Sequence, residues 1–221
     1  MEQQYDLSVI VTAHNEGILA HHTMKSLFRS VDYAKEQGIN IEIIAVLDKP
    51  DKETEEYFSR YNNHILVKKV DFRDLGLSRN FGINASSGKY ISILDADDLF
   101  GKNWLLELFK YMEQNNKAIA HPEYNVVFGE KNLIWKHISS LDEDFYVGNL
   151  IENNYWSSLC GALRETFISF PYKSTGRTSI FGFEDWHFNC ETLANSINHI
   201  IIPGTLHFIR KKNTGSLLSD T

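Results

Sequence analysis

Short apolar strands alternate with amphipathic helices through the first half of the chain, and this alternation limits the fold more than any other feature. The stretch LSVIVTA (7–13) is β-branched and apolar on both faces, as a strand buried in a parallel sheet would be. Further strands are expected at 41–48, 64–70 and 89–96, with helices at 18–37, around Tyr57 and at 75–86. Strands that alternate with helices predict an α/β fold with a mostly parallel, doubly wound sheet.

The second half of the chain has a looser pattern. YNVVFG and LIWKHI are expected to pair as a hairpin. Helices are also expected around Trp104 and at 145–152, 156–168 and 184–195, and strands at 198–202 and 205–210. Because no repeat, low-complexity tract or linker divides the chain, we expect one domain over 1–221. It should have helices on both faces of the sheet and a small antiparallel element in its second half.

The composition is that of an ordinary globular protein with an acidic surplus. Of 221 residues, 43% are hydrophobic and 23% charged, and the formal net charge is -7. This charge argues against a general nucleic-acid-binding protein, which would show a basic face. The N-terminus lacks the basic start of a signal peptide, and no apolar run has membrane-spanning length. The sequence therefore predicts a soluble cytoplasmic protein and leaves docking on a membrane surface open.

Carboxylates follow several of the expected strands at the point where each strand ends. Asp48 ends the second strand and Asp71 follows the third, while Asp95, Asp97 and Asp98 end the fourth. Parallel strands deliver their carboxyl ends to one edge of a sheet, where ligands bind. Some of these acids could instead cap helices or lie in solvated turns. An acidic cluster at a ligand crevice suits Mg²⁺ or Mn²⁺, which typically joins carboxylates to substrate phosphates.

Five segments, in order, resemble the inverting glycosyltransferases of family 2, which have the GT-A fold. They are VIVTAHNEG, VLDKPDKET, GLSRNFGINASSGKYISILDADD, FGFEDWHFNCETL and LHFIRKKNTGSLLS. The third resembles the family's Arg-Asn helix running into its DxD motif. The second departs from the usual VDDGSTDGT because Leu47 replaces the first aspartate. The resemblance covers nearly the whole chain.

The resemblance implies that a sugar moves from a nucleotide-diphosphate donor, with UDP-sugars favoured, to a hydroxyl of a glycan or glycolipid. It implies a divalent ion, Mn²⁺ or Mg²⁺, held by Asp97, Asp95 and His207. Residues 1–98 would form a nucleotide-binding half and 99–210 an acceptor-binding half, with 211–221 a flexible tail that closes over the donor. The residues implied in donor binding are Thr12, Asn15, Glu16, Asp48, Arg79, Asp95, Arg210 and Lys211.

An acceptor hydroxyl is a poor nucleophile until a base removes its proton, which typically contributes about 10²–10⁴-fold to the rate. The resemblance assigns this role to Asp185, the second acid of FEDW, and assigns acceptor or sugar orientation to Glu184 and Trp186. In-line displacement with a single base predicts inversion at the anomeric carbon. Acids in a first helical turn also stabilise the helix without any catalytic role, and that alternative stays open.

Two other functions fit parts of the sequence. Asp95-x-Asp97 after a strand also resembles the nucleophile motif of haloacid-dehalogenase-type phosphatases, although Leu99 and the other four segments do not fit that class. A non-catalytic GT-A domain that binds a nucleotide or a partner protein would explain the departure at Leu47. Metal-dependent glycosyl transfer in polysaccharide or glycolipid synthesis accounts for all five segments and is the favoured interpretation.

Overall fold

The strands in the described part of the chain join into one mixed sheet of nine strands. The computed structural model describes residues 5–115, 117–175 and 183–211. In chain order the strands are β1 (Tyr5–Ala13), β2 (Ile41–Asp48), β3 (Leu66–Val70), β4 (Gly88–Asp95), β5 (Leu99–Phe100), β6 (Ile119–Gly129), β7 (Leu133–Lys136), β8 (Gly161–Leu163) and β9 (His199–Lys211). The helices are α1 (Ala20–Lys35), α2 (Lys52–Ser59), α3 (Leu75–Ala85), α4 (Trp104–Gln114), α5 (Arg164–Ser169) and α6 (Glu184–Ala194), with 3₁₀ turns η1 (Gly17–Leu19) and η2 (Val147–Ile151).

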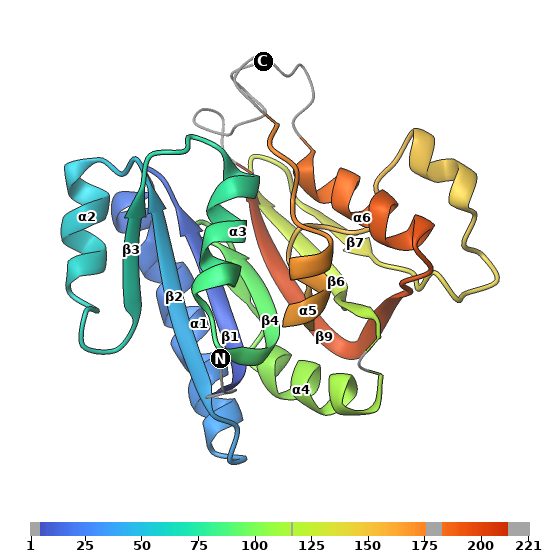
Figure 1. Ribbon diagram of the computed structural model, residues 1–221, viewed down its shortest axis with the longest axis horizontal. Helices are drawn as coiled ribbons and strands as arrows, with labels where there is room; N and C mark the ends of the chain where they lie inside the picture. Colours follow the sequence, from blue (N-terminus) through green and yellow to red (C-terminus); the bar gives the residue numbers. More distant parts are fainter. Residues whose placement is uncertain (1–4, 116, 176–182, 212–221) are drawn as a thin grey trace.

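The sheet divides into a parallel part and a mixed part (Figure 1). The strand order is β3-β2-β1-β4-β8-β6-β9-β5, with β7 paired to β6. Strands β3, β2, β1 and β4 are parallel to one another. Beyond β4 the pairs are antiparallel, except that β6 and β9 run parallel. The carboxyl ends of β1, β2 and β4 therefore lie side by side, as predicted.

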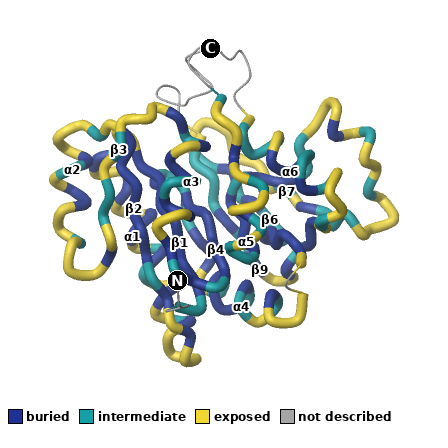
Figure 2. The backbone as a smooth tube through the Cα atoms, viewed as in Figure 1, coloured by how far each residue is buried: buried dark blue, intermediate teal, exposed yellow. Residues whose placement is uncertain are grey.

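Helices cover both faces of the sheet because successive strand residues point to opposite faces. Val9, Val11 and Leu47 belong to a core shared with α1, α2 and α4. Ile10 and Val46 belong to a second core shared with α3, α5 and α6. Figure 2 shows the central strands buried between these layers. In the described ranges no helix is long and apolar enough to cross a membrane.

The structure confirms the α/β prediction and corrects some element boundaries. Residues 156–163, predicted as the start of a helix, instead lead into β8, and only α5 that follows is helical. The two strands predicted at 198–202 and 205–210 form one strand, β9, with a register shift opposite Pro122. The hairpin of β6 and β7 is as predicted. Most of the predicted tail, 212–221, lies outside the described residues.

Hydroxyl groups on α1 hold the segment that follows β4. The Thr23 hydroxyl donates to the Ala96 carbonyl at 2.8 Å, and the Ser26 hydroxyl accepts from the Phe100 amide at 3.1 Å. One turn further on, the Ser30 hydroxyl accepts from the Leu105 amide at 3.3 Å. The segment that carries the aspartates after β4 is therefore held against α1.

The close approach of α3 to the sheet depends on Gly82. A Cβ there would lie 2.4 Å from Ile10 Cγ2 and 3.0 Å from Val46 Cγ2, both in the core. We predict that Gly82→Ala lowers the free energy of unfolding by about 1–3 kcal/mol through overpacking, measured by urea denaturation. Gly148→Ala is the matched control, because its Cβ would meet only the ring of Tyr146, which is 66% exposed. Equal stability of the two variants would contradict the packing argument.

Candidate active site

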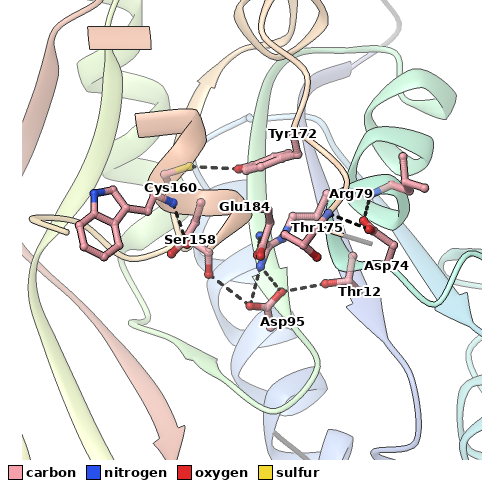
Figure 3. Close-up of polar contacts among 12 residues, drawn as sticks. Thr12, Asp74, Arg79, Asp95, Ser158, Cys160, Tyr172, Thr175 and Glu184 are labelled. Carbon is pink, nitrogen blue, oxygen red and sulfur yellow. Dashed lines mark hydrogen bonds and ion pairs between the residues drawn. The ribbon is translucent and has the colours of Figure 1, made fainter. Parts of the chain in front are cut away.

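A buried arginine joins two distant carboxylates at the carboxyl edge of the sheet (Figure 3). Arg79 on α3 donates through Nη2 to both oxygens of Asp95, at 2.9 Å each. Its Nη1 donates to Glu184 Oε1 at 2.6 Å. The Arg79 side chain is only 1% exposed. The first aspartate after β4 and the start of α6 are therefore tied to one cation.

Burial alone would lower the pKa of Arg79, but Asp95 and Glu184 outweigh it and raise that pKa well above its ordinary value. The guanidinium also lies over the ring of Tyr172, 5.2 Å from its centroid. Asp95 accepts two further bonds, from the Thr12 hydroxyl at 2.8 Å and the Ser158 hydroxyl at 3.2 Å. The site is thus a hydrogen-bonded network with its charges paired, as buried charges require.

Asp48 organises the loop between β3 and α3. Its Oδ1 accepts from the amides of Phe72 and Arg73, each at 2.8 Å. Its Oδ2 accepts from the Asp74 amide and the Ser78 hydroxyl, each at 2.9 Å. Leu47, which departs from the family motif, is 1% exposed and packs in the core on the other face. Leu47 therefore packs in the core, and Asp48 holds the loop.

The other two aspartates after β4 differ from Asp95. Asp98 is buried and accepts from the Arg210 amide at 2.8 Å. Burial, followed by the charges of Asp97 and Asp95, raises the pKa of Asp98 well above its usual range. Asp97 is only partly buried. The charges of Asp97 and Asp95 therefore act on Asp98, while the charge of Lys211 acts against them.

The structure does not gather the three predicted metal ligands into one coordination site. Across the described residues, no three His, Cys, Asp or Glu side chains are placed to hold an ion together. His207 lies in an aromatic pocket, 5.0 Å from the Phe100 ring and 4.5 Å from the Trp104 ring between centroids. Both of its ring nitrogens lack a hydrogen-bond partner, and burial lowers its pKa well below the usual value. A metal site that uses these residues therefore stays a prediction.

The proposed base lies at the first turn of α6, beside the arginine network. Burial, and next the charge of Glu184, raises the pKa of Asp185 to about 6, while Arg79 acts to lower it. Trp186 donates from its indole nitrogen to the Leu150 carbonyl at 2.9 Å, which anchors η2 against α6. Phe183, just before the helix, is left-handed with φ 82°. A carboxylate with this pKa is ionised and basic near neutral pH.

Asn15 and Glu16, predicted to bind the donor, follow β1; Asn15 is exposed and Glu16 is half-buried. Asn15 accepts from the Asp51 amide at 2.8 Å, and Glu16 accepts from the His14 amide at 2.6 Å. Asp51 caps α2 by accepting from the Thr54 amide, the capping alternative considered for such acids.

The last strand supplies the two basic residues predicted to bind the donor. Arg210 stacks on Phe128, 4.7 Å from the ring centroid, and its Nε donates to the Asp97 carbonyl at 3.3 Å. Lys211, the last described residue of β9, is exposed. Both lie beside the segment that carries Asp97 and Asp98.

Three participants were not predicted from the sequence. Ser158 reaches Asp95, Tyr172 lies under Arg79, and Asp74 caps α3 while accepting from the Ser174 hydroxyl and the Thr175 amide. Asp74 precedes an expected helix, so its capping role was detectable. Ser158 and Tyr172 come from irregular segments of the second half, and no local pattern marks them.

Over residues 8–177 the sequence matches the family described as Glycosyl transferase family 2. The chain belongs to glycosyltransferase family 2. Among curated glycosyltransferases, it is 27% identical over 213 residues to the poly(ribitol-phosphate) beta-N-acetylglucosaminyltransferase TarP of Staphylococcus aureus. That match covers 88% of this chain and 59% of TarP.

Solved glycosyltransferase structures share the fold. S. aureus TarS 1-349 in complex with UDP-GlcNAc superposes with a TM-score of 0.72 at 15% identity, covering 100% of this chain and 61% of that one. GalNAc-T7 with UDP, GalNAc and Mn²⁺ has a TM-score of 0.68 at 16% identity, covering 97% and 47%. The predicted GT-A fold is confirmed. The chain spans less than two thirds of each of these proteins and of TarP.

We predict that Arg79→Leu destabilises this glycosyltransferase domain by about 3–5 kcal/mol at pH 7.5, because two largely buried carboxylates lose their cation. Chemical denaturation measures the loss. Arg29→Leu, at an exposed arginine of α1, is the control. An equal loss of stability in the two variants would contradict the explanation by ion pairing.

Proposed function

We propose that this domain transfers a sugar from a nucleotide-diphosphate donor, a UDP-sugar in the first instance, to an acceptor hydroxyl with inversion. The observation that carries the proposal is the position of Asp185. It lies at the start of α6 beside Arg79 and Glu184, with its pKa raised to about 6, and Arg79 connects this point to Asp95. Family membership and the fold shared with UDP-GlcNAc-bound TarS support the same donor class.

In the proposed reaction the acceptor oxygen attacks the anomeric carbon as the bond from that carbon to the diphosphate oxygen breaks. Asp185 takes the hydroxyl proton, and the nucleoside diphosphate leaves with the bonding electron pair. A single displacement inverts the anomeric centre. Asp95 cannot act instead as a phosphatase nucleophile without leaving Arg79, because both of its oxygens are bonded there; this disfavours the phosphatase alternative.

A divalent cation, when bound, would neutralise charge on the departing diphosphate. Asp97 is the residue we propose to hold it, because it is only partly buried and lies in the acidic segment after β4, next to Arg210 of the last strand. Diphosphate oxygens and water would complete a shell of oxygen ligands, as such ions favour. His207, buried between aromatic rings, is not part of this proposal. Mn²⁺ in the GalNAc-T7 structure shows that a protein of this fold is found with such an ion.

The other residues predicted to bind the donor fall into two groups, those that would contact it and those that hold the pocket in place. We propose that Asn15 and Glu16 face the donor from the turn after β1. Arg210 and Lys211 would face it from β9 and attract its phosphates. Thr12, Asp48 and Arg79 support the pocket through the bonds described above. The acceptor would lie near Trp186 and η2. TarP, named for adding N-acetylglucosamine to poly(ribitol-phosphate), makes a cell-surface glycopolymer the first acceptor class to try.

Replacing the base should separate binding from chemistry. Asp185→Asn is expected to bind UDP with Mn²⁺ as the parent does, yet to lose at least 10²-fold in transfer rate, the contribution typical of a general base. Calorimetry measures the binding, and UDP release with acceptor measures the rate. Asp144→Asn, at an exposed acid, is the matched control. Unchanged transfer by Asp185→Asn would remove Asp185 as the base.

Asp97→Asn should instead weaken the joint binding of the metal and the donor. Loss of the carboxylate charge is expected to weaken UDP binding in Mn²⁺ at least tenfold and to leave binding in EDTA unchanged, because divalent ions prefer carboxylate oxygens. Titration calorimetry with and without EDTA provides both numbers. If His207→Phe weakens binding in Mn²⁺ as much as Asp97→Asn does, the assignment of Asp97 alone is wrong.

A further inference from the structure

We infer that Arg79 and Glu184 are positioning residues that hold the start of α6, and with it Asp185, against the end of β4, and that neither contacts the donor or acceptor. This inference rests on the proposed role of Asp185. The sequence resemblance implied instead that Arg79 approaches the donor and that Glu184 orients the acceptor or sugar.

The contacts of Arg79 leave little of it for a substrate. Its side chain is 1% exposed, Nη2 is used by Asp95, and Nη1 is used by Glu184. The planar guanidinium also lies over Tyr172. The Glu184 side chain is only 12% exposed, with Oε1 on Arg79. The two groups are therefore engaged with each other, next to Asp185 in the first turn of α6. The remaining donor of Arg79, Nε, is buried and has no hydrogen-bond partner among the described residues.

The two members of this ion pair act on Asp185 with opposite sign. The negative charge of Glu184 disfavours ionisation of Asp185, whereas the positive charge of Arg79 favours it. The charge of Asp95 on β4 also acts to raise the pKa of Asp185, and the charge of Asp185 acts to raise the pKa values of Cys160 and Tyr172. Burial raises the pKa of the Cys160 thiol to about 12 and that of Tyr172 well above its usual value, so both stay neutral.

Opposite pH shifts therefore test the inference. The acid limb of kcat/KM should lie near pH 6 in the parent, with activity falling below it as Asp185 takes up a proton. Glu184→Gln keeps a hydrogen-bond acceptor for Arg79 but removes the charge, and should move the limb down by about one pH unit. Arg79→Gln should move it up by about one unit. A role confined to folding would lower activity without moving the limb.

The same shifts should appear without turnover. Carbon-13 NMR of the aspartate carboxyls, with Asp185→Asn identifying the resonance, titrates Asp185 directly in the metal-free protein. If Arg79→Gln does not fold, the shift in the pKa of Asp185 in Glu184→Gln alone tests the inference. Glu165→Gln is the matched control, since Glu165 also pairs with an arginine, Arg164, but is 78% exposed; it should shift nothing.

The inference would be overturned if the pKa of Asp185 in Glu184→Gln, read from the acid limb and from the NMR titration, were unchanged or raised. So would a Glu184→Gln variant whose acceptor KM rises tenfold while its pH profile stays fixed, because that result marks an acceptor contact. Failure of the proposed function gives a different result, namely transfer that survives Asp185→Asn.

Discussion

The structure depends on a buried cation placed between two carboxylates that are far apart in the sequence. Arg79 comes from a helix on one face of the sheet, Asp95 ends a central strand, and Glu184 begins a helix from the second half. Burying these charges is favourable only if each stays paired and hydrogen-bonded. The pairing therefore fixes where α6 starts relative to β4, and with it the distance between the aspartates after β4 and Asp185.

The sheet makes this pairing possible. Parallel strands bring the ends of β1, β2 and β4 to one edge, so Thr12, Asp48 and Asp95 become neighbours although no local motif joins them. Each then has a different task. Thr12 and Asp95 bind each other, whereas Asp48 holds the loop before α3. Asp97 and Asp98 follow in the same segment, next to Arg210 of β9.

Much of the fold could be predicted from the sequence, because β1, β2 and β4 are apolar on both faces and alternate with helices that have one apolar face. The failure at 156–163 has a physical cause. β8 forms because it pairs with β4 and β6, and a Cβ at Gly161 would lie 2.5 Å from the Leu108 side chain, so long-range packing decides the conformation.

The candidate site was predicted less completely than the fold. Motifs pointed to Asp95, Arg79 and Glu184 separately, but the bond from Arg79 to Glu184 spans 105 residues and leaves no trace in local spacing. His207 pairs with Phe100, two residues after Asp98, and its ring packs against Phe100 and Trp104, contacts that local spacing does not mark.

A crystal structure with a UDP-sugar analogue and Mn²⁺ tests the central claim most directly. The account predicts that the diphosphate and metal lie against Asp97, that Asp185 faces the anomeric carbon from the acceptor side, and that Arg79 stays between Asp95 and Glu184. A diphosphate bound to Arg79 itself, with both ion pairs broken, would contradict it.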